Sequence, residues 1–338
     1  MSSSPPQPSP SGPRIACLPG DGIGPEVMAV AQDALRALAP DAELEEHLFG
    51  AAAIRATGDS LPAETLAACR EADAVLKAPI GDPEFDAADV RPEQGMLRLR
   101  AELDVYTNLR PAQQGAVDMV IVRELVGGLY FGERGVREDG TVYDTCEYHP
   151  SQVERIARRA FELARTRGGR LVSVDKANVL DTSRLWRRVV REVGADYPDV
   201  EVEDMLVDNA AMQLASSPEQ FDVIVTENMF GDILSDLAAA MTGGLGLAPS
   251  ASLGDAGPGI FEPVHGSAPD IAGRGIANPA AMLRSTALLL EHALGRPDEA
   301  RALEQAVDGA LETAPTPDLG GSSTTADVAS AVLRRLSA

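Results

Sequence analysis

The chain has 338 residues, of which 44% are hydrophobic, so it can bury a large core and is long enough for two domains. Its formal net charge of -23 argues against nucleic acid or an anionic membrane as partner, because both attract clustered Lys and Arg. Cys17, Cys69 and Cys146 are odd in number and widely spaced, which excludes a disulfide framework and a zinc site.

The N-terminal stretch, residues 1–13, is rich in Ser and Pro and has neither a basic start nor an apolar segment of signal-peptide type. We interpret it as a disordered tail. No apolar run in the sequence approaches the length needed to cross a membrane. These features predict a cytoplasmic protein.

Residues 14–18 predict a short buried strand, followed by a glycine-rich loop and a helix that runs to about Leu38. Gly20, Gly22 and Gly24 superficially resemble the dinucleotide-binding fingerprint, but their spacing is G-x-G-x-G and no clean second strand ending in an acid follows. A tight turn that needs positive φ is the favoured interpretation. A helix over 62–72 and a strand over 74–78 follow.

Three arginines lie in or beside apolar segments, namely Arg100, Arg110 and Arg123, the last of which ends a strand predicted over 119–123. Burying a guanidinium group without a partner among apolar residues costs free energy. Together the three would suit a substrate with more than one carboxylate, because the guanidinium fork binds a carboxylate through two hydrogen bonds. Each could instead be a structural partner for one of the 52 acidic residues.

Tyr130 lies in a loop with glycines on both sides, residues 127–132. Its phenol could serve as a general acid if its neighbours lower its pKa, and an ordinary core tyrosine is the alternative. Residues 136–148 predict an extended excursion of the β-arm type. A helix is predicted to begin at Ser151, with Glu154 three residues further on as a capping box.

A nearly continuous apolar stretch, residues 171–180, contains Lys176 at the end of its predicted strand. Open α/β sheets place their sites at this end of a strand. A partly buried lysine shifts its pKa readily and can act as a base. A surface lysine whose stem alone is buried is the alternative.

Acidic residues follow two further strands. The strand over 200–206 leads to Asp208, and a strand over 221–225 leads to a helix over 231–241 with Asp232 and Asp236 on one face. Two stacked carboxylates repel each other unless both face water or a cation lies between them. A hard divalent ion such as Mg²⁺ or Mn²⁺ prefers such oxygen ligands. A solvated acidic face is the alternative.

The chain is glycine-rich over 243–259, and a loop of small residues with exposed amides follows over 261–279. Such a loop allows a nucleotide to approach closely, and Asp270 could accept hydrogen bonds from a ribose diol while repelling a 2′-phosphate. A plain Gly/Pro surface loop is the alternative. Helices over 279–294, 297–313 and 325–336 close the chain.

Eight motifs occur in a fixed order, and in that order they resemble the β-decarboxylating dehydrogenases, the isocitrate/isopropylmalate dehydrogenase family. They are most similar to its 3-isopropylmalate branch, and the resemblance covers residues 14–336. The motifs are LPGDGIGPEV (Leu18–Val27), RPEQG (Arg91–Gly95), NLRP (Asn108–Pro111), VRELVGGLYFG (Val122–Gly132), DKANVL (Asp175–Leu180), FGDILSDL (Phe230–Leu237), EPVHGSAPDIAG (Glu262–Gly273) and DLGG (Asp318–Gly321).

The resemblance implies an α/β protein of two domains with a large mixed sheet, without a true Rossmann fold. It implies a first, NAD-side domain from residues 14–104 and 243–338, and a second domain over 105–242 that contains the dimer interface. It also implies a homodimer with shared active sites. The implied reaction is the NAD-dependent oxidative decarboxylation of (2R,3S)-3-isopropylmalate to 4-methyl-2-oxopentanoate and CO₂, in leucine biosynthesis.

By the same resemblance the three arginines hold the substrate carboxylates, Tyr130 is the acid, and Lys176 of the partner subunit is the base. Asp232, Asp236 and the partner subunit's Asp208 hold Mg²⁺ or Mn²⁺, and Asp208 also borders the substrate. Residues implied to face the alkyl branch of the substrate are Glu93, Met96 and Leu97. Residues implied to bind NAD are His265, Gly266, Ser267, Ala268, Asp270 and Asn278.

The sequence departs from the usual family pattern at Glu84 and Phe85, where lysine and tryptophan are common, and at Met96, where leucine is frequent. A related enzyme that acts on homoisocitrate, D-malate or tartrate is therefore an open alternative. A pocket for a second carboxylate would need extra basic residues, and Arg98 is the only candidate near Met96.

Two other classes of protein remain open, an ATP-using metalloenzyme and an idle NAD-binding paralogue. The missing Walker-type phosphate loop disfavours the first of them, and the full set of candidate catalytic residues disfavours the second.

Overall fold

The structure is a computed structural model, and it describes residues 12–337. The chain forms two compact units: unit 1 contains the described residues up to Leu99 and those from Ala256, and unit 2 is Arg100–Asp255. The first boundary falls inside helix α4 (Pro92–Glu102). The resemblance places the boundaries after residues 104 and 242 instead, and the roles that it gives the two domains remain predictions. Apart from Gly12 and Pro13, the expected tail lies outside the described residues.

Unit 1 contains four parallel strands in the order β2, β1, β3 and β12. Three of them, β1, β3 and β12, are almost completely buried, as expected for parallel strands that are covered on both faces. The edge strand has the charged sequence ELEE, which discourages pairing with another chain. The strand bounds are β1 Arg14–Leu18, β2 Glu43–Glu46, β3 Ala74–Lys77 and β12 Gly259–Pro263.

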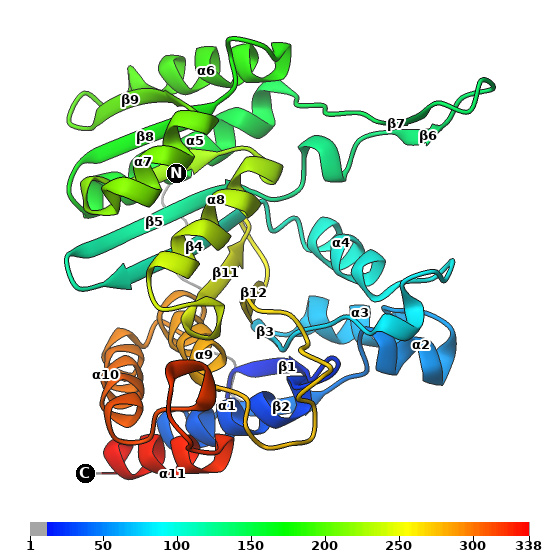
Figure 1. The fold of residues 1–338 in the computed structure, drawn as a ribbon, viewed down its shortest axis with the longest axis vertical. Helices are drawn as coiled ribbons and strands as arrows, with labels where there is room; N and C mark the ends of the chain where they lie inside the picture. Colours follow the sequence, from blue (N-terminus) through cyan, green and yellow to red (C-terminus); the bar gives the residue numbers. More distant parts are fainter. Residues whose placement is uncertain (1–11, 338) are drawn as a thin grey trace. The chain divides into compact units, whose positions relative to one another are not determined.

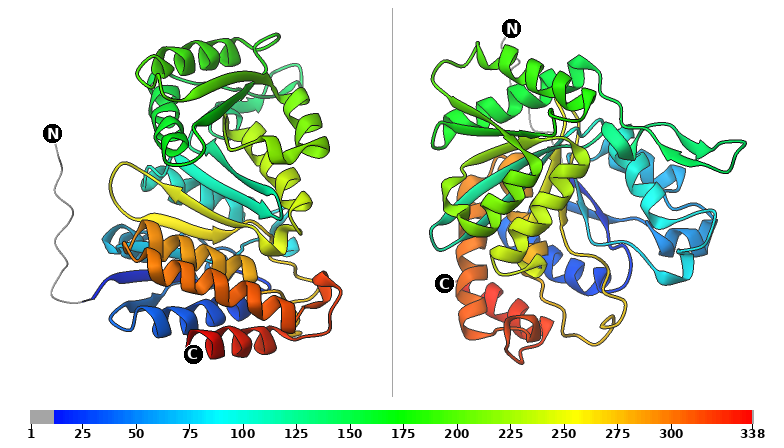
Figure 2. Two further views of the ribbon diagram at one scale, coloured as in Figure 1. Left: turned by 90° about the vertical axis from the view of Figure 1, so that its left-hand side faces the viewer. Right: turned by 45° about the horizontal axis from the view of Figure 1, so that its top comes forward.

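The helices of unit 1 include the three that the sequence predicts at the end of the chain, which lie beside one another in orange to red in Figure 2. The first helix begins with Pro25 in its first turn, where the missing N–H of proline is harmless. The bounds are α1 Gly24–Leu38, α2 Ala51–Thr57, α3 Ala63–Glu71, α9 Ala280–His292, α10 Pro297–Thr313 and α11 Thr325–Leu336.

The turn between β1 and α1 has the backbone that its glycines predict. Gly20 and Gly22 have φ of +66° and +58°. A Cβ on Gly22 would lie 2.0 Å from the carbonyl oxygen of Ser267, and the Ile23 N–H donates to that same oxygen at 2.8 Å. The glycines therefore allow the turn to contact the loop implied to bind nucleotide.

Unit 2 contains a mixed sheet of six strands in the order β11, β4, β5, β10, β8 and β9. β4 runs antiparallel to both of its neighbours, and the remaining pairs are parallel. The sheet and its covering helices confirm the predicted α/β class (Figure 1). The strand bounds are β4 Thr107–Gln114, β5 Val117–Glu124, β8 Arg170–Asp175, β9 Glu201–Leu206, β10 Val223–Thr226 and β11 Pro249–Leu253.

Successive side chains of these strands point to opposite faces of the sheet, so unit 2 has a hydrophobic core on each face. Val120 and Val122 of β5 pack with helices α5 (Pro150–Thr166) and α6 (Asp181–Gly194) on one face. Met119 and Ile121 pack on the other face, with helices α7 and α8. The bounds of these last two helices are α7 Val207–Ser216 and α8 Asn228–Met241. Each helix layer thereby fixes its residues relative to the sheet.

Several local predictions need correction. The predicted capping box at Ser151 is wrong: His149 is the N-cap of α5, and Gln152 completes the box. The helix with the two aspartates begins at Asn228, three residues earlier than predicted, because Glu227 caps it. β11 and β12 lie in stretches that we interpreted as loops. The β-arm is confirmed as the hairpin β6 (Arg134–Val136) and β7 (Val142–Asp144), which projects from unit 2 in Figure 1.

Candidate active site

Two of the three candidate arginines lie on neighbouring strands of unit 2. In the antiparallel register of β4 and β5, Asn108 is opposite Arg123, and Arg110 is two residues further along β4. Helix α8 crosses close to β5 at Gly231, where a Cβ would lie 2.6 Å from Cγ of Arg123. The glycine of the FGD motif therefore lets the helix lie directly on the arginine stem.

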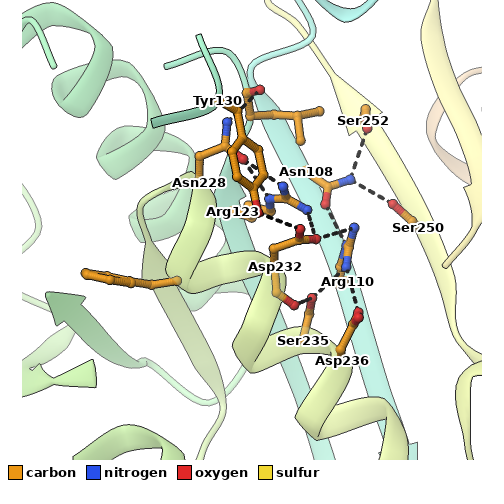
Figure 3. A network of polar contacts seen from close by, with 12 residues as sticks. Asn108, Arg110, Arg123, Tyr130, Asn228, Asp232, Ser235, Asp236, Ser250 and Ser252 are labelled. Atoms are coloured by element: carbon orange, nitrogen blue, oxygen red, sulfur yellow. Dashed lines mark hydrogen bonds and ion pairs between the residues drawn. The ribbon is translucent and has the colours of Figure 1, made fainter. Parts of the chain in front are cut away.

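Asp232 contacts three side chains of the network (Figure 3). One carboxylate oxygen accepts from the Arg123 guanidinium and lies 3.4 Å from Nη2 of Arg110. The other oxygen accepts from the Tyr130 phenol at 3.0 Å. The side chain of Arg123 is only 2% exposed, so its contact with Asp232 is a buried, charge-assisted one.

Arg110 connects Asp232 to the next turn of the helix. Its Nη1 donates to Ser235 at 2.7 Å and to Asp236 at 3.2 Å, and its Nε donates to Asn108 at 2.9 Å. Asn108 is fixed in turn by the hydroxyls of Ser250 and Ser252 on β11 (Figure 3). Two arginines and two aspartates thus form one network, which disfavours the alternative of a purely solvated acidic face.

Burial and charge act in opposite directions on the two aspartates. Burial raises the pKa of Asp232, but the charges of Arg123, Arg110 and Arg100 outweigh this and keep the pKa below its usual value. Burial raises the pKa of Asp236 above its usual value, with Arg110 opposing and Asp232 adding to the rise. The effect on Asp232 also shows that Arg100, the third candidate arginine, lies close enough to act on this network.

Burial also lowers the pKa of Arg123 to about 10, and the nearby charge of Arg110 adds to this. Tyr130 differs from its prediction. Burial raises its pKa above the usual value, and the charge and hydrogen bonding of Asp232 raise it further. The condition that its neighbours lower this pKa is therefore not met, and the phenol keeps its proton at neutral pH.

Lys176 and Asp208 form a separate pair in unit 2. Lys176 directly follows β8, and its Nζ lies 2.5 Å from Oδ1 of Asp208 in the first turn of α7. This contact lowers the pKa of Asp208. The Lys176 backbone is fixed by Ser183, whose hydroxyl accepts its N–H at 3.0 Å. Within residues 12–337 no three His, Cys, Asp or Glu side chains gather into a metal site, so one chain alone does not join Asp208 to Asp232 and Asp236.

In unit 1, the candidate nucleotide loop follows β12. His265 Nδ1 lies 3.0 Å from the Gly266 carbonyl, and its buried Nε2 has no hydrogen-bond partner among residues 12–337. Ala268 has a φ of +42°, which is unusual for a residue with a Cβ. Asn278 accepts the N–H of Ala280, the first residue of helix α9 (Ala280–His292), and donates to Asp318 at 3.0 Å. Asp270 is exposed and accessible to a ligand.

The residues implied to face the alkyl branch lie on helix α4. Met96 is buried, Leu97 is half-buried and Glu93 is exposed. Arg98, the only basic residue that could serve a second carboxylate there, binds Asp59 and the Leu61 carbonyl instead.

The departures at Glu84 and Phe85 also have a local explanation. Both lie in a short 3₁₀ helix, Pro83–Phe85. Glu84 accepts from Arg55 of α2 at 2.5 Å, and the same guanidinium lies over the Phe85 ring, 5.3 Å from its centroid. These residues bind each other on the surface of unit 1.

Several residues that organise the site were not predicted. Asn228 accepts two hydrogen bonds from Arg123, and Asn108 and Ser235 hold Arg110. Asp21 is buried and accepts from the backbone N–H groups of Ala51, Ala52 and Gly81, each at 3.0 Å. Two sequence signals could have indicated these residues. Asn228 is the first residue of a helix, and Asp21 lies between two glycines with positive φ.

Asp21→Ala is expected to lower the free energy of unfolding by about 2–4 kcal/mol, because three buried N–H groups lose their acceptor. Urea unfolding followed by circular dichroism measures this change. Asp33→Ala is the matched control, since Asp33 makes an exposed contact with Arg36 on the same helix. Equal stability of the two variants would contradict the role of Asp21.

None of the helices within residues 12–337 is both long and apolar enough to cross a bilayer. The geometry joins arginines, aspartates and a tyrosine in unit 2, with a lysine–aspartate pair elsewhere on the same unit. Such a set can bind an acidic substrate, accept a hard cation and transfer protons.

The chain belongs to the isocitrate/isopropylmalate dehydrogenase family, whose model matches residues 14–332. Among its curated relatives is a 3-isopropylmalate dehydrogenase from Zymomonas mobilis, which is 51% identical, with 96% of this chain and 99% of that protein covered. Another from Bacillus subtilis is 51% identical, with coverage of 88% and 89%.

Solved structures agree with this family. An isocitrate dehydrogenase from Methylococcus capsulatus superposes with a TM-score of 0.89 at 38% identity, covering 96% of this chain and 99% of that one. A β-decarboxylating dehydrogenase from Thermococcus kodakarensis gives a TM-score of 0.83 at 40% identity, covering 96% of each chain. These structures confirm the predicted fold class.

Proposed function

We propose that this chain catalyses the NAD-dependent oxidative decarboxylation of (2R,3S)-3-isopropylmalate to 4-methyl-2-oxopentanoate and CO₂. The observation that carries the proposal is about half identity, over nearly the whole length, to relatives that bear the name of this activity. The Arg110–Arg123–Asp232 network supports it, because it offers binding groups for an acidic substrate. A cytoplasmic location in leucine biosynthesis is part of this proposal.

The substrate carboxylates would bind at Arg100, Arg110 and Arg123. Arg110 and Arg123 contact the two aspartates, and the charge of Arg100 also acts on Asp232, so positive charge is concentrated here although the chain carries -23 overall. Arg123 donates a hydrogen bond to the side chain of Asn228, and Arg110 donates one to the side chain of Asn108. Both guanidinium groups are therefore oriented before substrate binds. Preorganised cations of this kind bind a dicarboxylate with little rearrangement.

A divalent cation fits the oxygen donors of Asp232 and Asp236. They lie one turn apart on α8, and the second oxygen of Asp236 makes no hydrogen bond that we identify within residues 12–337. The partner subunit's Asp208 would complete the set in a homodimer. When bound, Mg²⁺ or Mn²⁺ would supply Lewis acidity toward the substrate hydroxyl and the later enolate oxygen.

A homodimer with shared active sites is supported by exposed apolar residues on the helices that carry the acids. Met212 of α7 and Ile233 of α8 are each 59% exposed. Asp208 and Lys176 are accessible at the surface of the same unit. A second copy that covers this surface would bring its own Lys176–Asp208 pair toward Asp232.

Two residues would move protons. Lys176 would take the proton of the substrate hydroxyl, and Tyr130 would return a proton to the carbon that loses CO₂. When bound, NAD⁺ would supply the hydride acceptor. The raised pKa of Tyr130 suits this role, because the phenol is protonated when it is needed. Lys176 is one of only two lysines among 29 basic residues, which supports a task that arginine cannot perform.

NAD fits the loop after β12. The buried Nε2 of His265 has no partner within residues 12–337, so it can bond to a ligand. Gly266, Ser267 and Ala268 would let the nucleotide approach, and Asn278 would complete the site. The exposed carboxylate of Asp270 would bind the ribose diol and disfavour NADP.

The related activities are not favoured. Arg98 is bound to Asp59 and Leu61, which leaves no extra basic group beside Met96 for a second carboxylate arm. Met96 and Leu97 would suit the isopropyl group instead, since methionine adapts its shape to an apolar ligand.

The proposal is tested by following NADH absorbance with 3-isopropylmalate, homoisocitrate, D-malate and tartrate in turn. We expect the highest kcat/KM with 3-isopropylmalate and NAD⁺, and loss of activity in EDTA that Mg²⁺ or Mn²⁺ restores. A higher kcat/KM with any of the other acids would contradict the substrate, and full activity in EDTA would contradict the metal. Preference for NADP⁺ would contradict the role of Asp270.

A further inference from the structure

Tyr148 lies just before helix α5 and contacts the first residue of helix α8. Its phenol oxygen accepts the backbone N–H of Asn228 at 3.0 Å. The first N–H groups of a helix have no acceptor within the helix. The Tyr148 phenol provides an acceptor for one of them, the N–H of Asn228. The same helix carries Asp232 and Asp236 one and two turns later.

The ring of Tyr148 also supports the loop that presents Tyr130. A Cβ on Gly127 would lie 2.7 Å from Cε1 of Tyr148, and a Cβ on Gly128 would lie 2.6 Å from its hydroxyl. Gly128 has a φ of +72° and begins the 3₁₀ turn that ends at Tyr130. The two glycines are thus required for the loop to pack against Tyr148.

Two buried glutamates anchor the same two elements. Glu124 accepts the N–H groups of Val126 and Gly127, at 3.2 and 2.9 Å, on the loop side. Glu227 accepts the Phe230 N–H at 2.9 Å on the helix side, and the Tyr148 hydroxyl lies 3.5 Å from its other oxygen. Hydrogen bonding from Tyr148 lowers the pKa of both glutamates, against the larger effect of burial, which raises that of Glu124 to about 7.

Asn228 carries the connection into the substrate site. Its side-chain N–H groups donate to the carbonyls of Leu125 and Gly127, and its oxygen accepts two bonds from Arg123. Arg123 in turn binds Asp232. A continuous chain of hydrogen bonds therefore runs from Tyr148 through Asn228 to the network in Figure 3.

We propose that Tyr148 is a positioning residue for this reaction: its phenol joins the loop of Tyr130 to the helix of Asp232 and holds both at working distance. It touches neither substrate nor metal. The inference rests on the proposed function, since it names a residue that sets the geometry of that same site.

The test compares Tyr148→Phe with Tyr197→Phe, a matched loss of one hydroxyl from a ring that packs in the same hydrophobic core. We expect kcat of Tyr148→Phe to fall on the order of 10- to 100-fold, with KM for 3-isopropylmalate changed less than about threefold. The control should keep the wild-type kcat. A displaced Tyr130 or Asp232 affects the chemical steps, whereas Arg110, which Asn108 holds, still binds a substrate carboxylate.

The pH dependence of kcat separates this role from a general loss of stability, which would not shift the acidic limb of the profile. The groups that face Glu124 are Arg155 of α5 and Tyr148. Those that face Glu227 are Arg123, Tyr130, Cys146 and Tyr148. Without the phenol the pKa of both glutamates rises, so their ionised forms are reached only at higher pH. A protonated glutamate accepts the N–H of Gly127 or Phe230 less strongly, and the loop or helix is then held less firmly. The acidic limb of kcat should therefore shift to higher pH in Tyr148→Phe and stay in place in Tyr197→Phe.

A wild-type kcat and an unshifted profile in Tyr148→Phe would overturn the inference and leave the proposed function intact. Failure of the wild-type enzyme to oxidise 3-isopropylmalate would instead refute the proposed function. If Tyr148→Phe loses its circular dichroism spectrum, Glu124→Gln replaces it. That variant keeps the size of the side chain and one acceptor oxygen, and a wild-type profile for it would overturn the inference.

Discussion

Lys176→Ala should lower kcat on the order of 10³-fold, because the substrate hydroxyl loses the base that removes its proton. KM for 3-isopropylmalate should change little, since the carboxylates are bound by arginines elsewhere. Stability should also change little, because Asp208, the partner of Lys176, is 66% exposed and regains water. Initial rates of NADH formation measure the effect.

Two further variants sharpen this result. Lys176→Arg keeps the positive charge but provides no usable base, so it should be nearly as inactive as Lys176→Ala. Arg188→Ala removes an exposed cation from nearby helix α6 and should keep the wild-type kcat. Substantial activity of Lys176→Arg would show that Lys176 contributes charge rather than proton transfer.

Lys176→Ala also allows the shared active site to be tested. If Lys176 acts in the site of the other chain, a mixed dimer of Lys176→Ala with Asp232→Asn contains one site with both residues intact. Random exchange makes half of the dimers mixed, so about a quarter of wild-type activity should return when the two inactive proteins are refolded together. No recovery would place both residues in the site of one chain.

Asp232→Asn should lower kcat by a similar factor, on the order of 10³, because the metal loses a charged ligand and with it several kcal/mol of transition-state stabilisation. The variant should also need more Mg²⁺ for half-maximal rate. A second effect follows from burial: Arg123 is 2% exposed and loses its ion-pair partner, which should cost about 1–3 kcal/mol of unfolding free energy. Activity titrated with Mg²⁺ and urea unfolding separate the two effects.

Asp236→Asn is the matched comparison. The Asp236 side chain is 53% exposed, and its contact with Arg110, at 3.2 Å, is longer than the contact between Asp232 and Arg123. Loss of the Asp236 charge should therefore weaken Mg²⁺ binding with little change in stability. Wild-type turnover in Asp232→Asn would contradict the metal assignment. Equal stability of the two variants would contradict the buried pairing of Arg123 with Asp232.

The sequence located most of the secondary structure because its signals are local. Nearly continuous apolar runs predicted β5, β8 and β10, and helical spacing together with proline positions predicted α1, α9, α10 and α11. It failed where local signals conflicted. β11 and β12 were not predicted, because the glycines around them indicate loops. The capping box was placed two residues late because histidine is an uncommon N-cap.

Within the site, the sequence by itself determined which chemical groups are present: three arginines, three aspartates, a lysine and a tyrosine, in an order that identifies the family. Only the tertiary structure decided which of them meet. It joined Asp232 to Arg123, left Asp208 with Lys176, and turned Arg98 toward Asp59. It also decided that the pKa of Tyr130 rises. The physical reason is that periodicity and motif order are properties of neighbours along the chain, whereas desolvation and Coulomb interactions depend on distances through space that only packing fixes.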